Sequence, residues 1–591
     1  MPFDGITLAA IARELNHELT GARIHKIYQP EKDEICLVLR KANHENANLV
    51  ISANPELARI HLAQVRKDNP KQAPAFCMLL RKYLEGAKLK EITQNGFERV
   101  LTLHIDALND FREWEEKQLV FELMGKHSNL ILLQPERQII IDAIKRYTRE
   151  VNAYRQIMPG STYIAPPPQD KLNPMSMDPE DFFIRLYALD SSLTLAKSVF
   201  TVVAGCSLTT AKELCLNIGL DPEIPLSTCG EYELSRLWST LRKWVTETPH
   251  GYVWRKQKTN LDFAAYPFQK IPAEIETYNM VNLACDAYFQ ERLNRETLLA
   301  AQNAIAKKIR QQLDRTYKKH FLQTGDQQKS QENKKYKIWG ELLTAFAYQF
   351  KKGDREACLV NFYNDESVVI ELDPRYTPIE NAQRFFKIYN KSQAALKHLE
   401  TLLCTTQNEI DYLESVLTSI IQSESLKEVA AIRQELIVEG YLKGKNDNKK
   451  NKLEKLPPRR FISSDGYNIL VGRNNQQNDW LTLKAAAKND LWLHTQNIPG
   501  SHVIIDLPQG TGQIEEIPDR TLEEAAQIAA YYSKARSGSK VPVDYTFQAN
   551  VKKPPGAKPG MVIYNPYWSM LSTPVLELTE KTERLEKDEK D

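Results

Sequence analysis

A run of apolar residues at heptad spacing constrains this chain more than any other feature of its sequence. Over residues 396–420 the seam positions recur at intervals of three and four, a coiled-coil pattern kept for more than three heptads. The seam consists of Leu396, Leu399, Leu403, Thr406, Ile410, Leu413, Leu417 and Ile420. An earlier arm carries Leu298, Ala301, Ile305, Ile309 and Leu313.

Two arms of similar length on either side of compact material predict a chain that runs out and returns. Between the arms lie "IWGELLTAFAYQF" and the hairpin-like "ACLVNFYNDESVVIEL". We therefore expect residues 276–440 to form an antiparallel intramolecular coiled coil with a small inserted hairpin. A long helical rod that dimerises is the alternative.

The rest of the chain must be divided among other domains, because 591 residues exceed what one hydrophobic core supports. Residues 1–170 combine helical and strand patterns and predict a mixed α/β domain. Residues 459–572 predict a last compact α/β domain, and residues 573–591 a charged tail. The expected fold class is multidomain α+β.

Two intervening segments could bind phosphate. Residues 175–272 read as helical, and their "VAGCSLTTAKELCLNIGLDP" has a glycine turn at Gly205 between two helices. This is the outline of a helix-hairpin-helix, whose turn presents backbone N–H groups to phosphate; an ordinary corner between two helices fits the spacing equally well. The lysine-rich linker of residues 441–458 is either a solvated tether or a clamp for an RNA backbone.

The cysteines and the N-terminus predict a cytoplasmic protein. The eight cysteines are scattered and include no C-x-x-C pair, so we expect no metal site and no redox dithiol. The N-terminus lacks the apolar stretch of a signal peptide, and the most apolar segment, "LTLAKSVFTVVAGC", is too short to span a bilayer. We expect no membrane partner and no cofactor. Because the formal net charge is only +2, nucleic-acid binding would have to rest on local basic patches.

The stretch "LWLHTQNIPGSHVII" holds the residue types of a hydrolase site in His494, Ser501 and His502. Adjacent residues of a strand point to opposite faces, so Ser501 and His502 cannot serve each other as nucleophile and base. Two strands joined by a turn are the simpler interpretation. No P-loop, dinucleotide-binding, zinc-protease or nucleophile-elbow motif occurs either. We therefore expect no catalytic residue and a structural or RNA-facing role for these three side chains, and the missing motifs weigh against a self-contained hydrolase or NTPase.

Several long stretches resemble the RqcH/NEMF family of NFACT-domain proteins, of the bacterial type. The segment "RRFISSDGYNILVGRNNQQNDWLTLKAAAKNDLWLHTQNIPGSHVII" is similar to the NFACT-R domain. "FDGITLAAIARELN", "GARIHKIYQP", "FCMLLRKYLEGAKL" and "ELMGKHSNLILL" are similar to the NFACT-N domain, and "NAQRFFKIYNK" is similar to the middle region. The resemblance extends over nearly the whole chain.

The resemblance implies a ribosome quality control factor. Such proteins bind large (50S) ribosomal subunits obstructed by peptidyl-tRNA and recruit alanyl-tRNA. The stalled nascent chain then receives an untemplated alanine tail that marks it for degradation. Bond formation belongs to the ribosome, so the resemblance implies a factor that positions tRNA and is not an enzyme. It is expected to be monomeric on the ribosome.

The resemblance also implies candidate RNA contacts. An Asp-Arg pair in NFACT-N matters for tRNA recruitment in the family, and Glu98 and Arg99 of "NGFERVLTLHI" occupy the matching positions. The arginine is kept, and the acid is one methylene longer. We expect this pair on a strand, with its side chains on opposite faces if the strand is regular. Without the resemblance, Arg99 would be interpreted as a plain surface residue on a strand edge. Asp4 of "FDG" is expected as a second tRNA contact. The basic residues expected to touch RNA are Lys449, Lys450, Arg459, Arg460 and Arg473.

Two other functional classes stay open at this point. A helix-hairpin-helix behind an α/β domain also suits a DNA-repair protein, and a preference for duplex DNA over tRNA would favour that class. The family also carries the label of fibronectin-binding protein, and secretion or surface labelling would favour an adhesin or scaffold.

Overall fold

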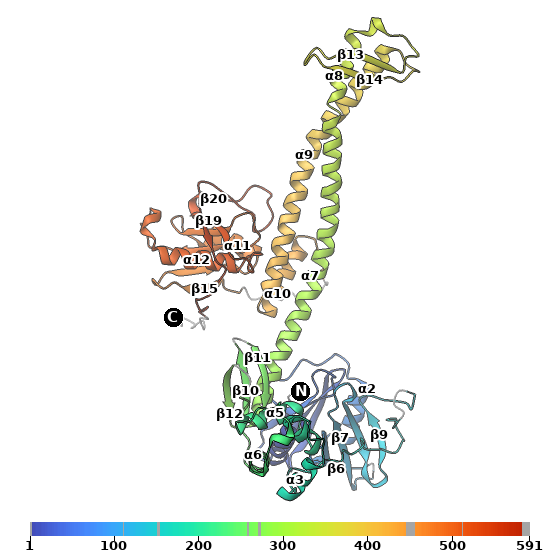
Figure 1. Ribbon diagram of the computed structural model, residues 1–591, viewed down its shortest axis with the longest axis vertical. Coiled ribbons are helices and arrows are strands. Elements are labelled where there is room, and N and C mark those ends of the chain that lie inside the picture. The colour runs from blue at the N-terminus through green and yellow to red at the C-terminus, as the bar shows by residue number, and fades with distance from the viewer. Residues whose placement is uncertain are drawn as a thin grey trace. The chain divides into compact units, whose positions relative to one another are not determined.

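The computed structural model describes residues 3–109, 111–150, 154–256, 259–269, 273–444, 456–510 and 512–581 (Figure 1). The chain divides into two compact units, residues 1–295 and 296–591. Both units combine helices with antiparallel sheets, so the predicted multidomain α+β class is confirmed. Among the helices of the described ranges, none has the length and apolar character needed to cross a membrane.

A nine-stranded antiparallel sheet forms the centre of the first unit, in the order β4-β3-β2-β1-β5-β6-β7-β8-β9. Its strands are β1 (Arg23–Glu31), β2 (Glu34–Arg40), β3 (Asn46–Ser52), β4 (Arg59–Ala63), β5 (Lys88–Gln94), β6 (Val100–Leu108), β7 (Trp114–Glu122), β8 (Asn129–Gln134) and β9 (Ile139–Ala143). The amphipathic helices α1 (Gly5–Leu19) and α2 (Ala75–Leu84) bury their apolar faces in the core of this unit. The strands alternate buried and half-buried residues most clearly in β6, as expected where one face is more deeply buried than the other.

Four helices follow the sheet: α3 (Pro179–Tyr187), α4 (Leu195–Val202), α5 (Leu208–Asn217) and α6 (Glu231–Thr246). The expectation that residues 175–272 are helical throughout is wrong after α6. There, β10 (Gly251–Lys256), β11 (Thr259–Ala264) and β12 (Glu274–Tyr278) form an antiparallel sheet in the order β11-β10-β12. Its aromatic and β-branched residues favour strands, and Gly251 permits close packing on helix α7 (Val281–Glu332), since a Cβ there would lie 2.5 Å from Cβ of Ala284.

The second unit contains the predicted antiparallel coiled coil, formed by α7 and α9 (Pro378–Gln422). Figure 1 shows the two arms side by side. Their direction follows from cross-contacts: Gln302 donates to the carbonyl of Ser423 over 2.8 Å, and Asn333 donates to Ser392 Oγ over 2.9 Å. The buried seam includes Ile305, Ile309 and Leu313 from α7, and Ile410, Leu413, Val416 and Ile420 from α9. This intramolecular pairing is the predicted form of the coiled coil.

A small lobe joins the two arms, and a short helix follows the second. The lobe consists of α8 (Lys335–Ala345) and the hairpin of β13 (Glu356–Val360) and β14 (Ser367–Glu371), with a core of its own. The hairpin matches the one predicted between the arms. After α9, helix α10 (Leu426–Val438) packs Val429, Ile432 and Leu436 against the coiled-coil seam.

The C-terminal domain has a six-stranded antiparallel sheet in the order β15-β16-β18-β17-β19-β22. Its strands are β15 (Arg459–Ile462), β16 (Asn468–Val471), β17 (Leu491–Thr495), β18 (Val503–Asp506), β19 (Val541–Phe547) and β22 (Trp568–Ser572), and a separate pair consists of β20 (Val551–Lys552) and β21 (Ile563–Tyr564). Helix α12 (Asp519–Tyr531) covers one face with Ala525, Ala526 and Ile528. The short helix α11 (Asn475–Trp480) follows β16.

Candidate nucleic-acid interface

Glu98 and Arg99 lie in the turn between β5 and β6, so the expectation that they sit on a strand is wrong. The strand begins only at Val100. The turn forms at Asn95 and Gly96: the N–H of Glu98 donates to the carbonyl of Asn95 over 3.0 Å, and Gly96 has a φ of 56°. Glycine adopts this left-handed backbone without the steric cost of a Cβ. Strand alternation therefore does not determine where the two side chains point.

The turn is braced from two distant parts of the first unit. Phe97 is buried where α1 begins and where the α4–α5 turn passes, and the N–H of Gly5 donates to the carbonyl of Gly205 over 2.8 Å. A Cβ on Gly5 would lie 2.0 Å from the carbonyl oxygen of Phe97. Gln94 adds two hydrogen bonds from its amide, to the carbonyls of Glu98 (2.8 Å) and Gly5 (3.1 Å). These contacts fix the backbone that carries Glu98 and Arg99.

The guanidinium of Arg99 is available for a ligand. Arg99 is half-buried, and its carbonyl accepts a hydrogen bond of 2.8 Å from the N–H of Leu123. Within the described part of the chain, its side chain forms no hydrogen bond or ion pair, and none joins it to Glu98. Glu98 instead accepts a bond of 3.4 Å from the N–H of Gln169. The turn thus presents an uncommitted cation on a rigid backbone, which suits recognition of phosphate or a base edge.

Asp4, expected as a second tRNA contact, is 5 % exposed, and its carboxylate is occupied. It is the N-cap of α1 and accepts a hydrogen bond of 2.9 Å from the N–H of Thr7. It also accepts from the N–H of Ser207 (3.3 Å) and from the hydroxyls of Thr210 and Tyr266. This geometry gives Asp4 a positioning role, because it ties α1 to the helices that follow the sheet. The sequence signal was present, since aspartate directly before a helix is a common N-cap.

The same contacts decide what the predicted helix-hairpin-helix can bind. Helix α5 begins after Ser207, where backbone N–H groups would receive an anion. Asp4 already supplies a carboxylate there, and Gly205, at a φ of 74°, packs against Phe97. This turn is therefore internal, and it braces the Glu98–Arg99 turn instead of offering its N-terminus to phosphate.

The basic residues predicted to touch RNA fall into three groups. Lys449 and Lys450 lie outside the described residues. Arg460 is half-buried and donates two hydrogen bonds, of 3.1 and 3.0 Å, to the side chain of Asn468. Arg459 is buried and Arg473 is half-buried, and both form ion pairs within the protein, so the prediction that they contact RNA does not fit the geometry.

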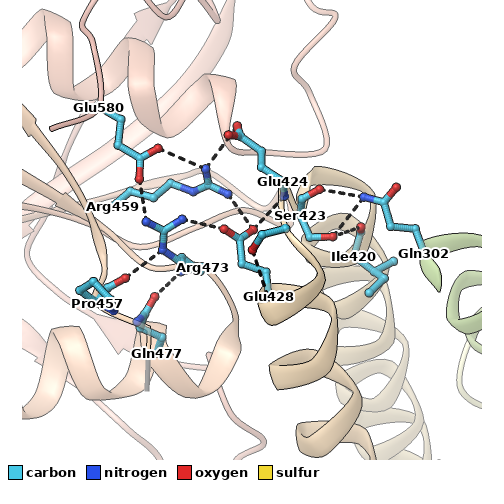
Figure 2. Close-up of polar contacts among 11 residues, drawn as sticks. Gln302, Ile420, Ser423, Glu424, Glu428, Pro457, Arg459, Arg473, Gln477 and Glu580 are labelled. Atoms are coloured by element: carbon cyan, nitrogen blue, oxygen red, sulfur yellow. Dashed lines mark hydrogen bonds and ion pairs between the residues drawn. The ribbon is translucent and has the colours of Figure 1, made fainter. Parts of the chain in front are cut away.

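Figure 2 shows Arg459 and Arg473 both directed toward the carboxylate of Glu428 in α10. One carboxylate oxygen of Glu428 lies 3.0 Å from the guanidinium of Arg459, and the other lies 2.6 Å from the guanidinium of Arg473. A carboxylate oxygen of Glu580 lies 2.6 Å from the guanidinium of Arg473. Arg459 also pairs with Glu424 over 3.2 Å. Arg459 and Glu428 are each 3 % exposed. The cluster holds the C-terminal domain against α10 at the base of the coiled coil. The residues next to these arginines in the sequence do not predict this role.

A second buried contact joins the same two parts. Glu435 of α10 accepts hydrogen bonds from the Tyr412 hydroxyl (3.0 Å) and from the side-chain amide of Asn475 in α11 (3.3 Å). Burial raises the pKa of Glu435 to about 7. The C-terminal domain is thus held on the coiled coil by buried polar groups, which makes the removal of one partner costly.

Of the suspected hydrolase residues, His494 lies on β17, and Ser501 and His502 directly precede β18, which pairs antiparallel with β17. His502 is buried: its Nδ1 accepts from the Thr482 hydroxyl over 2.7 Å, and its Nε2 donates to the carbonyl of Gly560 over 3.2 Å. Burial lowers the pKa of His502 to about 3 and that of His494 to about 4. With both ring nitrogens of His502 occupied, no lone pair is left to accept a proton from Ser501.

Replacing Ser501 with alanine should therefore leave function nearly intact, because this residue is held through its backbone N–H, which donates to the carbonyl of Tyr532. His502→Ala should instead lower the melting temperature, because the hydroxyl of Thr482 and the carbonyl of Gly560 lose a buried hydrogen-bond partner. Leaving a buried polar group without its partner costs about 1–3 kcal/mol of stability. Thermal melts of both variants check this, together with an assay for the alanine tailing that the family resemblance implies. A folded Ser501→Ala protein that binds large subunits yet has no tailing activity would revive the nucleophile interpretation.

Family models match almost the whole chain. The model for the NFACT N-terminal and middle domains matches residues 4–455, and the model for the NFACT protein RNA binding domain matches residues 458–565. The chain belongs to the NFACT family. The predicted membership in the RqcH/NEMF family is confirmed by relatives that match from end to end. RqcH of Bacillus subtilis is 34% identical over 584 residues, covering 97% of this chain and 98% of the relative. RqcH of Streptococcus suis is 36% identical over 575 residues, with the same coverage.

Solved structures of a streptococcal protein also match in two parts. The N-terminal part of the fibronectin/fibrinogen-binding protein of Streptococcus suis is 33% identical, covers 49% of this chain and 99% of that chain, and has a TM-score of 0.42. The C-terminal part is 34% identical, covers 47% of this chain and 96% of that chain, and has a TM-score of 0.38. The family membership gives this protein a role in ribosome quality control, with an RNA-binding domain at its C-terminal end.

Proposed function

We propose that this protein binds large ribosomal subunits obstructed by peptidyl-tRNA and recruits alanyl-tRNA, so that the stalled nascent chain receives an untemplated alanine tail. The main support for this proposal is the full-length similarity to RqcH relatives. In addition, a rigid turn presents the uncommitted guanidinium of Arg99 at the position that matters for tRNA recruitment in the family. The alanine tail then marks the nascent chain for degradation.

The protein acts in this proposal by positioning tRNA, and peptide-bond formation stays with the ribosome. The hydrogen bonds that occupy both ring nitrogens of His502 support a factor that binds without chemistry of its own. A long coiled coil suits such a factor, because each helical residue adds about 1.5 Å and two arms can bridge widely separated ribosomal elements. The proposed site of action is the cytoplasm.

Association with the large subunit tests this proposal. In a sucrose gradient of a lysate that contains stalled complexes, the full-length protein should co-sediment with free large subunits. It should leave them as the salt concentration rises, because phosphate contacts release counterions on binding. If the protein stays at the top of the gradient at low salt, with obstructed subunits present, the proposed function is wrong.

A further inference from the structure

One face of α7 carries a concentration of positive charge that takes no part in the packing of the coiled coil. Within residues 307–319 the sequence has six cations and a single carboxylate, Asp314. The six, here called the basic face, are Lys307, Lys308, Arg310, Arg315, Lys318 and Lys319, and all are exposed. At 3.6 residues per turn they fall on the solvent side of the helix, opposite the seam residues Ile309 and Leu313.

The basic face is not neutralised by any other side chain of the described residues. In the part of the chain that the structure describes, none of its six side chains forms an ion pair or a hydrogen bond. The opposite arm offers a carboxylate nearby in Glu414, but that group accepts from Tyr317 of α7 and pairs with Lys534 over 3.0 Å. Like charges three and four residues apart destabilise a helix. A helix that keeps such a face gains stability when a polyanion lies along it.

Two large apolar side chains adjoin the basic face. Phe321 is 78 % exposed and Leu322 is 66 % exposed, one turn beyond Lys318. An aromatic ring beside lysines and arginines is the combination that nucleic acids bind, since phosphates take the cations and a sugar or base packs on the ring.

We propose that the basic face of α7, with Phe321 and Leu322 at its end, is a docking surface for the backbone of ribosomal RNA in the large subunit. The cations extend over about 18 Å of helix, counted at 1.5 Å per residue. That length and charge density fit a run of phosphates better than a single acidic side chain. Ribosomal RNA is favoured over tRNA because the turn that carries Arg99 belongs to the other unit of the chain. The inference rests on the proposed function and names a surface for its ribosomal partner.

A pair of matched charge variants tests the docking surface in the full-length protein. The first is Lys307→Gln, Lys308→Gln and Lys318→Gln together, and the control is Lys387→Gln, Lys391→Gln and Lys397→Gln on α9, which are exposed lysines of the same coiled coil. Glutamine keeps helix propensity close to that of lysine. The probes are purified obstructed large subunits and protein-free large-subunit rRNA, each titrated from about 50 to 200 mM salt.

The α7 variant should bind both probes at least tenfold more weakly near 100 mM salt, and its plot of log affinity against log salt should be shallower by about 2–3 units. The control should behave as the unaltered protein. Equal affinity and equal slope for the α7 variant would overturn the docking surface while leaving the proposed function standing. If the unaltered protein binds neither probe, both proposals fail together.

A third variant separates RNA from a protein partner. Phe321→Ser should weaken binding to protein-free rRNA as well as to subunits, with an unchanged salt slope, because it removes no charge. If Phe321→Ser or the triple α7 variant weakens binding to intact subunits but not to protein-free rRNA, the surface docks on a ribosomal protein, and the assignment to RNA is wrong.

Discussion

Replacing Arg99 with alanine should abolish alanine tailing and remove alanyl-tRNA from the purified complex, while binding to the large subunit persists. The guanidinium has no partner within the described residues, so its loss leaves the fold intact and removes only an external contact. A charge-assisted hydrogen bond contributes on the order of 1.5–3 kcal/mol, which reduces tRNA capture at least about tenfold. Mass spectrometry of the tail on a stalled reporter, in cells that lack the native protein, measures the effect.

Two companion variants make this result specific. Arg23→Ala removes an exposed arginine of the same unit whose side chain forms no hydrogen bond or ion pair within the described ranges, and it should leave tailing unchanged. Glu98→Asp restores the acid common in the family and should be nearly silent. Full tailing by a folded Arg99→Ala protein would show that the family's tRNA position was transferred to the wrong residue.

Glu428→Ala should strongly destabilise the attachment of the C-terminal domain. It would leave Arg459, which is 3 % exposed, and Arg473 without their shared carboxylate. Breaking a buried ion pair by removing one partner costs about 3–5 kcal/mol. The C-terminal domain should therefore separate from α10 at a lower temperature.

The matched control is an ion pair between the C-terminal domain and helix α9 of the coiled coil. Lys534 is 56 % exposed and pairs with Glu414 over 3.0 Å, so Lys534→Ala should cost less than about 1 kcal/mol. Differential scanning calorimetry of both variants compares the two effects. A Glu428→Ala protein that melts within a degree of the unaltered protein would mean that the cluster in Figure 2 does not hold the domain in place.

Local patterns in the sequence are sufficient to predict much of the fold. The coiled-coil seam repeats every few residues, so the spacing alone places Ile309 and Ile410 on facing arms. The first strands of the large sheet are equally readable, because β2 and β4 are short apolar runs bounded by turns. The helical prediction is wrong for β10 and β11. The pattern of aromatic and β-branched residues in β10 covers only six residues, so the signal for a strand is weak.

The candidate site depends on contacts that the sequence does not show. Glu428 and Glu580 lie 45 and 107 positions from Arg473, so no local pattern links them, and in the sequence this arginine resembles a free cation. The partners of Asp4, Ser207 among them, likewise come some two hundred residues later, so its buried role is hidden. The turn at Gly96 is recognisable, since "NG" marks turns, and this signal places Glu98 outside the strand.

The RNA that accompanies the protein tests the central claim most directly. The tagged full-length protein is purified from cells in which ribosomes have been stalled, and the bound RNA is sequenced. The account predicts large-subunit rRNA together with a strong enrichment of alanine tRNA over all other tRNAs. Large-subunit rRNA with no tRNA enriched, or a preparation without ribosomal RNA, would contradict it.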